Sequence, residues 1–175
     1  MLGEIFSRLK RQNSQSLMNP DHAEARIELG LAYHNAGQLS KAVKAYLSAL
    51  EIDSKFVTAY KHLGAAYDEM GQFVDALKVY AKAIVLEPQD AELRIDLGLV
   101  YFNIGSYSEA VKAFKQALDI DAINARAHYC LALVYLDLGD TQMAMEEHAQ
   151  LHSLNEKDLA FQLLEKIQLQ SRQAS

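Results

Sequence analysis

The residues whose type and spacing could do chemistry are two histidines near the carboxyl end. His148 and His152 lie four residues apart, a spacing that places two imidazoles on one face of a helix, where they can bind a metal ion. No third ligand of suitable type follows at a predictable distance. His148 also takes the place of an aromatic residue that recurs along the chain. We therefore expect no metal site.

The single cysteine, Cys130, is the other candidate for chemistry. His128 is the one histidine within predictable reach, but residues two apart on a helix point in different directions. The sequence holds no glycine-rich phosphate loop, no HExxH and no paired CxxC. We therefore expect no catalytic residues, no cofactor and no enzyme activity.

A phrase of five residues that returns every 34 residues organises the chain. It reads Leu-Gly-Leu-Ala-Tyr at 29–33, Leu-Gly-Ala-Ala-Tyr at 63–67, Leu-Gly-Leu-Val-Tyr at 97–101 and Leu-Ala-Leu-Val-Tyr at 131–135. A fixed period of this size predicts a solenoid of paired helices, in which each repeat packs on its neighbours.

Glycine, small and aromatic residues keep the same step after the phrase, and the glycines stand where the chain must turn between two helices. The columns are Gly37, Gly71, Gly105, Gly139; Ala42, Ala76, Ala110, Ala144; Tyr46, Tyr80, Phe114, His148; and Ala49, Ala83, Ala117, Leu151. This pattern resembles the tetratricopeptide repeat (TPR). The resemblance covers four units, 23–56, 57–90, 91–124 and 125–158. It implies an all-α fold, a right-handed α-solenoid of four TPR helix pairs.

Helix starts and close contacts can be placed within each unit. The first helices should begin near Ala23, Val57, Ala91 and Ala125, with Asp90 and Asn124 as N-caps. A glycine inside a helix lowers its stability by up to about 1 kcal/mol, so close packing must offset that cost. We expect Gly64 to face Ala76, because two small residues let the helices of a pair approach.

Residues 1–22 read as an appendage. Residues 1–11 predict an amphipathic helix whose apolar stripe is Leu2, Ile5, Phe6 and Leu9, with Arg8, Lys10 and Arg11 beside it. The polar residues 12–19 form a linker that spans at most about 28 Å when extended. Three roles stay open for this N-terminal helix: capping the first repeat, docking on a neighbouring chain, or binding a membrane surface.

Residues 159–175 read as a C-terminal capping helix and tail. Asp158 should open the helix, which runs to about Gln170 with Leu159, Leu163 and Ile167 on one face. A solenoid needs such a helix, because the last apolar face has no following repeat to cover it.

Charge and composition narrow the classes of partner. The formal net charge is −6, and the basic residues are relatively enriched before the first repeat. An acidic body argues against a nucleic-acid partner. The longest apolar run, residues 97–102, is far too short to span a membrane, and the first residues lack the pattern of a secretory signal. With one cysteine, we expect a cytoplasmic protein.

The side of each first helix that is opposite the leucine and tyrosine of the phrase is the candidate binding surface. In TPR proteins this face lines a concave groove that takes peptides or helices, and the resemblance implies the same here. The candidate groove residues are Ile27, Leu31, Lys61, Ala65, Ile95, Leu99, Phe102, Asn103, Arg126, Tyr129, Leu133 and Leu136. Helix curvature offers an alternative, in which several of the apolar ones lie in the core between repeats.

One known ligand class is disfavoured by the residues at these places. Chaperone-binding TPR domains hold a terminal carboxylate with lysine, arginine and asparagine at fixed repeat positions. If the comparison starts at the first repeat, those positions hold Ile27, Leu31, His62, Glu92 and Asp96. If it starts at the second repeat, they hold Lys61, Ala65, Asp96, Arg126 and Cys130. Neither frame completes the clamp.

The sequence therefore predicts a non-enzymatic adaptor for protein–protein interaction. Its partner would be a helical or extended protein segment of apolar and basic character, bound by an apolar floor and an acidic rim. Two alternatives stay open. One is a self-assembling scaffold, a homo-oligomer in which the N-terminal helix docks on a neighbouring chain. The other is a peripheral membrane adaptor, disfavoured because residues 1–11 are few.

Overall fold

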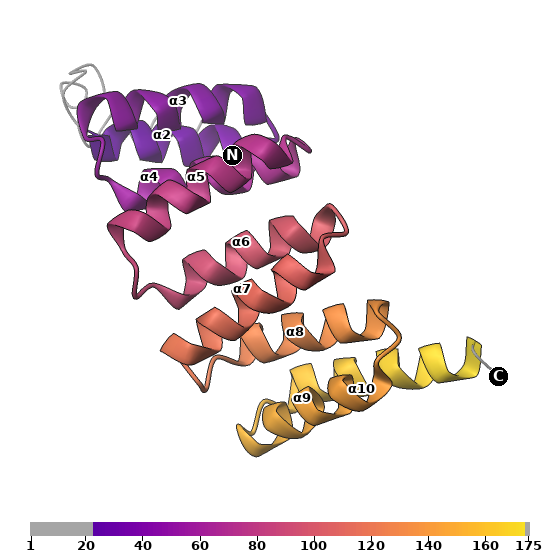
Figure 1. Cartoon of the computed structure of the whole chain (residues 1–175). Helices are drawn as coiled ribbons and strands as arrows, with labels where there is room; N and C mark the ends of the chain where they lie inside the picture. Colours follow the sequence, from indigo (N-terminus) through magenta and orange to yellow (C-terminus); the bar gives the residue numbers. More distant parts are fainter. Residues whose placement is uncertain (1–22, 174–175) are drawn as a thin grey trace. The chain divides into compact units, whose positions relative to one another are not determined.

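The computed structural model describes residues 23–173, which form nine α-helices and no strand (Figure 1). The helices are α2 (Ala23–Asn35), α3 (Leu39–Ile52), α4 (Val57–Glu69), α5 (Phe73–Leu86), α6 (Ala91–Asn103), α7 (Tyr107–Ile120), α8 (Ala125–Asp137), α9 (Thr141–Ser153) and α10 (Lys157–Gln173). This confirms the all-α fold class and the four predicted helix starts. The predicted helix at 1–11 and its linker lie outside the described residues.

The chain divides into two compact units, residues 1–88 and 89–175. In the first unit α2 packs against α3 and α4 against α5. In the second α6 packs against α7 and α8 against α9, and α10 packs on both α8 and α9. Each pair is a helical hairpin of the kind that the 34-residue period predicts.

The turn inside each helix pair depends on its glycine. The φ angles are +70° at Gly37, +70° at Gly71, +74° at Gly105 and +78° at Gly139. This left-handed conformation is easily reached only by glycine, because a side chain would crowd the following carbonyl. The predicted role of the glycine column as a turn between helices is therefore confirmed.

Side-chain caps start two of the helices as predicted. Oδ1 of Asp90 accepts a hydrogen bond from the backbone N of Leu93 at 3.2 Å, and Oδ1 of Asn124 accepts one from Ala127 at 3.1 Å. Such a cap satisfies one of the backbone donors that a helix leaves unpaired at its start. The carboxylate of Asp140 caps α9 in the same way, a cap that the sequence analysis missed.

The side chain that lies nearest to Gly64 is that of Tyr80, whereas the sequence-based expectation named Ala76. A Cβ atom built on Gly64 would lie 2.6 Å from Cζ of Tyr80, so the glycine makes room for the ring of the aromatic column. Gly30 has the same relation to Tyr46. The missing side chain of the glycine is therefore what makes room for the ring.

Each unit has its own buried core. In the first unit Tyr46, Ala59 and Leu63 are central. In the second the core joins α6 through α10, with Phe114 and Leu151 both fully buried. Leu151, which interrupts the alanine column, fills the core in the last repeat.

The last helix covers the end of the second unit as the sequence predicts. Ala160, Leu163 and Ile167 are buried, and Nε2 of Gln170 donates to the backbone carbonyl of Leu136 at 2.6 Å. The helix begins one residue earlier and ends three residues later than expected. No helix within residues 23–173 is long and apolar enough to cross a membrane.

Candidate functional site

Three of the twelve candidate groove residues are buried and do not form a surface. Ile27, Ile95 and Leu136 expose 5%, 0% and 6% of their area. The first helices of successive repeats pack on one another, so Ile27 joins a cluster with Leu63 of α4, and Ile95 joins one with Leu131 of α8. The alternative of apolar residues tucked between repeats holds for these positions.

Leu136 is buried for a second reason. It shares its cluster with residues of α10, whose Gln170 also binds its backbone carbonyl. The C-terminal helix therefore covers one end of the face that α8 would otherwise present. This burial depends on where α10 packs, so it could not be predicted from the helical periodicity of α8 alone.

The other candidates stay at the surface in part or in full. Asn103 and Arg126 are exposed, whereas the rest are half-buried: Leu31, Lys61, Ala65, Leu99, Phe102, Tyr129 and Leu133. Four of these are large and apolar and belong to the second unit. We call them the apolar strip: Leu99, Phe102, Tyr129 and Leu133. The ring of Phe102 is supported by Tyr107, at 5.9 Å between ring centroids and with a 55° tilt.

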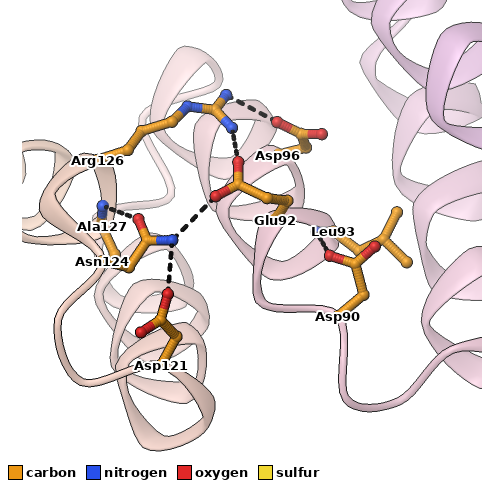
Figure 2. A network of polar contacts seen from close by, with 8 residues as sticks. All are labelled: Asp90, Glu92, Leu93, Asp96, Asp121, Asn124, Arg126 and Ala127. Carbon is orange, nitrogen blue, oxygen red and sulfur yellow. Dashed lines mark hydrogen bonds and ion pairs between the residues drawn. The ribbon is translucent and has the colours of Figure 1, made fainter.

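A network of polar and charged side chains joins α6, the end of α7 and the start of α8 (Figure 2). Nη1 of Arg126 donates to Oε2 of Glu92 at 2.5 Å, and Nη2 donates to Oδ1 of Asp96 at 2.8 Å. Nδ2 of Asn124 donates to Oε1 of Glu92 at 2.9 Å and to Asp121 at 3.2 Å. The network ties the start of α6 to the start of α8.

The charge of this network is predominantly negative. Burial works against the charged form of Arg126, but the hydrogen bonds and charges of Asp96 and Glu92 outweigh it and raise the pKa. The guanidinium of Arg126 thus stands between the carboxylates of Glu92 and Asp96, and that of Arg94 lies 3.3 Å from the carbonyl oxygen of Asp90. A basic side chain brought to this place would be attracted.

The sequence patterns considered above did not predict this network as a unit. Glu92 and Arg126 stand one period apart, at the same position of consecutive repeats. Opposite charges at equivalent positions of neighbouring repeats were the signal that could have revealed the pair, because those positions lie side by side when repeats stack.

The corresponding face of the first unit has a different character. Nε2 of His34 lies 2.8 Å from Oε1 of Glu69, and the His62 ring stacks on Tyr46 at 5.6 Å between centroids. Burial, together with the charges of His34 and Lys61, lowers the pKa of His62. This face is polar and carries two histidines, and Leu31 is its one large apolar candidate at the surface, whereas the second unit has four.

His128 and Cys130, which were weighed as candidates for catalysis, are both buried. Nδ1 of His128 lies 2.6 Å from Oε2 of Glu147, and Nε2 lies 3.2 Å from the carbonyl oxygen of Ala122. Burial raises the pKa of Cys130 to about 11, so it is a thiol at neutral pH. Within residues 23–173 no three histidine, cysteine, aspartate or glutamate residues form a group that could hold a metal ion.

Comparison with known proteins gives a family model and structural neighbours. A family model described as TPR repeat matches residues 30–71, 67–105 and 101–139. A crystal structure of MamA matches with a TM-score of 0.77 and 24% identity, over 89% of this chain and 91% of that one. The structure of MamA from Desulfovibrio magneticus RS-1, which starts at its residue 41, matches with a TM-score of 0.76 and 23% sequence identity. The match covers 89% of this chain and 86% of that one.

A third neighbour is TTC0263, a thermophilic TPR protein of Thermus thermophilus. It matches with a TM-score of 0.75 and 23% identity, over 95% of this chain and 92% of that one. No curated protein sequence matches the chain. At these identities the structural likeness concerns the fold alone.

Proposed function

This chain belongs to the tetratricopeptide repeat family, and on that premise we propose that it is a non-enzymatic adaptor that binds a helical or extended protein segment. The segment would present apolar side chains to the second unit and basic side chains beside them. Because the family's repeats serve protein–protein interaction, the fold supports this general role. We place the protein in the cytoplasm on the strength of its single, buried cysteine.

The observation that carries the proposal is the apolar strip together with the nearby network of Glu92, Asp96 and Arg126, called the acidic network below. Leu99, Phe102, Tyr129 and Leu133 come from α6 and α8 and are only half-buried. Covering a large apolar side chain fully contributes about 1.5–3 kcal/mol, so completing the burial of four half-buried ones would supply several kcal/mol. Association itself is costly, and a strip of this size therefore suits a short segment better than a large flat partner.

The acidic network would set the choice among apolar segments. A lysine or arginine next to the apolar residues would meet the carboxylates of Glu92 and Asp96, which also bind Arg126. Charge complementarity of this kind favours correct partners and repels acidic ones. The partner class is thus an apolar segment with a basic flank.

A displayed library of random peptides, selected on the full chain, tests the proposal. We expect enrichment of peptides with an apolar core and a lysine or arginine flank. The double variant Leu99→Asp and Leu133→Asp should lose this enrichment, because two carboxylates would lie where apolar side chains must dock. Val85→Asp is the matched control, since Val85 is apolar, 80% exposed and on α5 of the other unit.

Two further measurements make the result decisive. Circular dichroism of each variant shows whether the helices persist, so that a folding failure is not mistaken for a lost site. Asp96→Asn should keep the apolar preference and weaken the preference for basic flanks. Selection of the same peptides by the double variant and by the unaltered chain would refute the proposal.

A further inference from the structure

A cleft in the first unit lies away from the face discussed so far. It has a volume of about 410 Å³ and is bounded by α3, α4 and α5. Its wall is largely apolar and includes Leu47, Leu50, Tyr60, Leu63, Tyr67 and Val79. Leu47, at the edge, exposes 41% of its area. Because α3 and α5 are the second helices of their pairs, the cleft does not belong to the face formed by the first helices.

The repeat itself does not impose this opening. Two periods later, His128 stands in the place of Tyr60 and Glu147 in the place of Val79. Those two side chains contact each other at 2.6 Å, and 10% and 12% of their side-chain areas are exposed. In the second unit the corresponding place is therefore closed by a buried polar contact, whereas in the first unit apolar side chains leave it open.

We propose that the cleft holds the apolar stripe of the chain's own residues 1–11, namely Leu2, Ile5, Phe6 and Leu9. The helical hairpins bring the start of α2, the end of α3, the start of α4 and the end of α5 to one end of the first unit (Figure 1). Glu51 and Tyr60 line the cleft near that end. The described chain begins at Ala23, at this same end of the first unit.

The intervening chain is long enough. Residues 12–22 span about 36–40 Å when extended. Neighbouring packed helices lie about 8–10 Å apart, so three such steps from α2 reach any helix of the first unit within about 30 Å. The stripe can reach the cleft without any change in the four helices.

Tethering favours the chain's own segment over a free partner. The charges at the cleft balance, with Glu51 and Asp75 against Lys78 and Lys82, and Asp75 pairs with Lys78 at 3.2 Å. Affinity must therefore come from a few apolar contacts, which bind a free peptide only weakly. A short linker raises the local concentration of the segment to about millimolar, which suffices to fill a weak site.

A spin label on the full chain tests the proposal. Ser7 is not part of the stripe, so Ser7→Cys provides a labelling site, and the buried thiol of Cys130 does not compete for the reagent. We expect the nitroxide to broaden the amide resonances of residues 47–51 and 79–82 strongly. The amides of Tyr129 and Leu133, on the apolar strip, should keep their intensity.

Variants and mixing complete the test. Leu47→Asp should abolish the broadening, and Val85→Asp, which lies outside the cleft on α5, should preserve it. A mixture of isotope-labelled chains without nitroxide and unlabelled chains with nitroxide should show no broadening. Broadening in that mixture alone, broadening centred on Leu31 and Ala65, or no broadening in any sample would each overturn the proposal.

Discussion

At the scale of single residues, a ring and a missing side chain determine how the two helices of a repeat meet. A Cβ atom on Gly98 would lie 2.6 Å from Cε1 of Phe114, and Gly64 has the same relation to Tyr80. In the fourth repeat the glycine is Ala132 and the aromatic ring is the smaller imidazole of His148. The two positions thus change together, as expected of residues that share one volume.

This pairing predicts the result of a substitution. Gly64→Ala should lower the free energy of unfolding by about 1–3 kcal/mol, because the added methyl group forces the ring of Tyr80 to move. Urea denaturation followed by circular dichroism measures the loss. The helix-propensity gain of alanine, up to about 1 kcal/mol, works in the opposite direction.

A double-mutant cycle provides the control for this prediction. Tyr80→His, which copies the fourth repeat, should make Gly64→Ala less costly than it is in the unaltered chain. Gly64→Ala with no loss of stability, or with the same loss in both backgrounds, would contradict the packing explanation.

Residue columns could be found from the sequence, but their contacts could not. The period identified Gly64, Ala76 and Tyr80 as structural positions, and the glycine turns followed from the same reasoning. The angle at which the two helices cross decides which residue of the second helix lies nearest to Gly64. The spacing of residues within one helix does not predict that angle. The burial of Ile27 and Ile95 comes from contacts between repeats, so the sequence offered it only as an alternative and did not say which positions it would affect.

At the scale of elements, α10 differs from the other helices because nothing described follows it. Leu163 is fully buried against α8 and α9, whereas Leu169, on the same helix, exposes 58% of its area. The sequence predicted the apolar stripe of this helix from its period. It did not predict that α10 would also cover Leu136, since that requires the position of one helix on another.

The two leucines of α10 form a matched pair. Leu163→Ala should lower the free energy of unfolding by about 2–5 kcal/mol, because it leaves a cavity under the helix. Leu169→Ala, with the same change in volume at the surface, should alter it by less than about 0.5 kcal/mol. Urea denaturation of both variants compares them directly. Equal losses would show that α10 is not packed as described.

At the scale of the whole molecule, the 34-residue period predicted the fold. It did not predict that the face formed by the first helices would be apolar in the second unit and polar in the first. Leu99 and Leu133 lie one period apart and share their place on α6 and α8, as the sequence indicates. The equivalent positions of the first unit, Leu31 and Ala65, lie among histidines and carboxylates that interact with one another. The sequence analysis treated the same face of all four repeats as one surface. It therefore did not show this difference between the units, which depends on the side-chain contacts within each unit.

The role of residues 1–11 leads to a prediction about the assembly of the full chain. If their stripe fills the α3–α5 cleft of its own chain, Phe6→Asp should leave the molar mass from light scattering unchanged. It should also lower the free energy of unfolding by no more than about 3 kcal/mol, the contribution of one buried phenylalanine.

The competing interpretation, a scaffold built through these residues, predicts the opposite pair of results. The full chain would then be an oligomer, and Phe6→Asp would convert it to monomers, because a carboxylate in the stripe would prevent docking on the neighbour. Light scattering over a range of protein concentrations separates the two interpretations, since a contact within one chain does not depend on concentration whereas a contact between chains does. An oligomer that dissociates on Phe6→Asp would assign residues 1–11 to assembly and leave the cleft without its occupant.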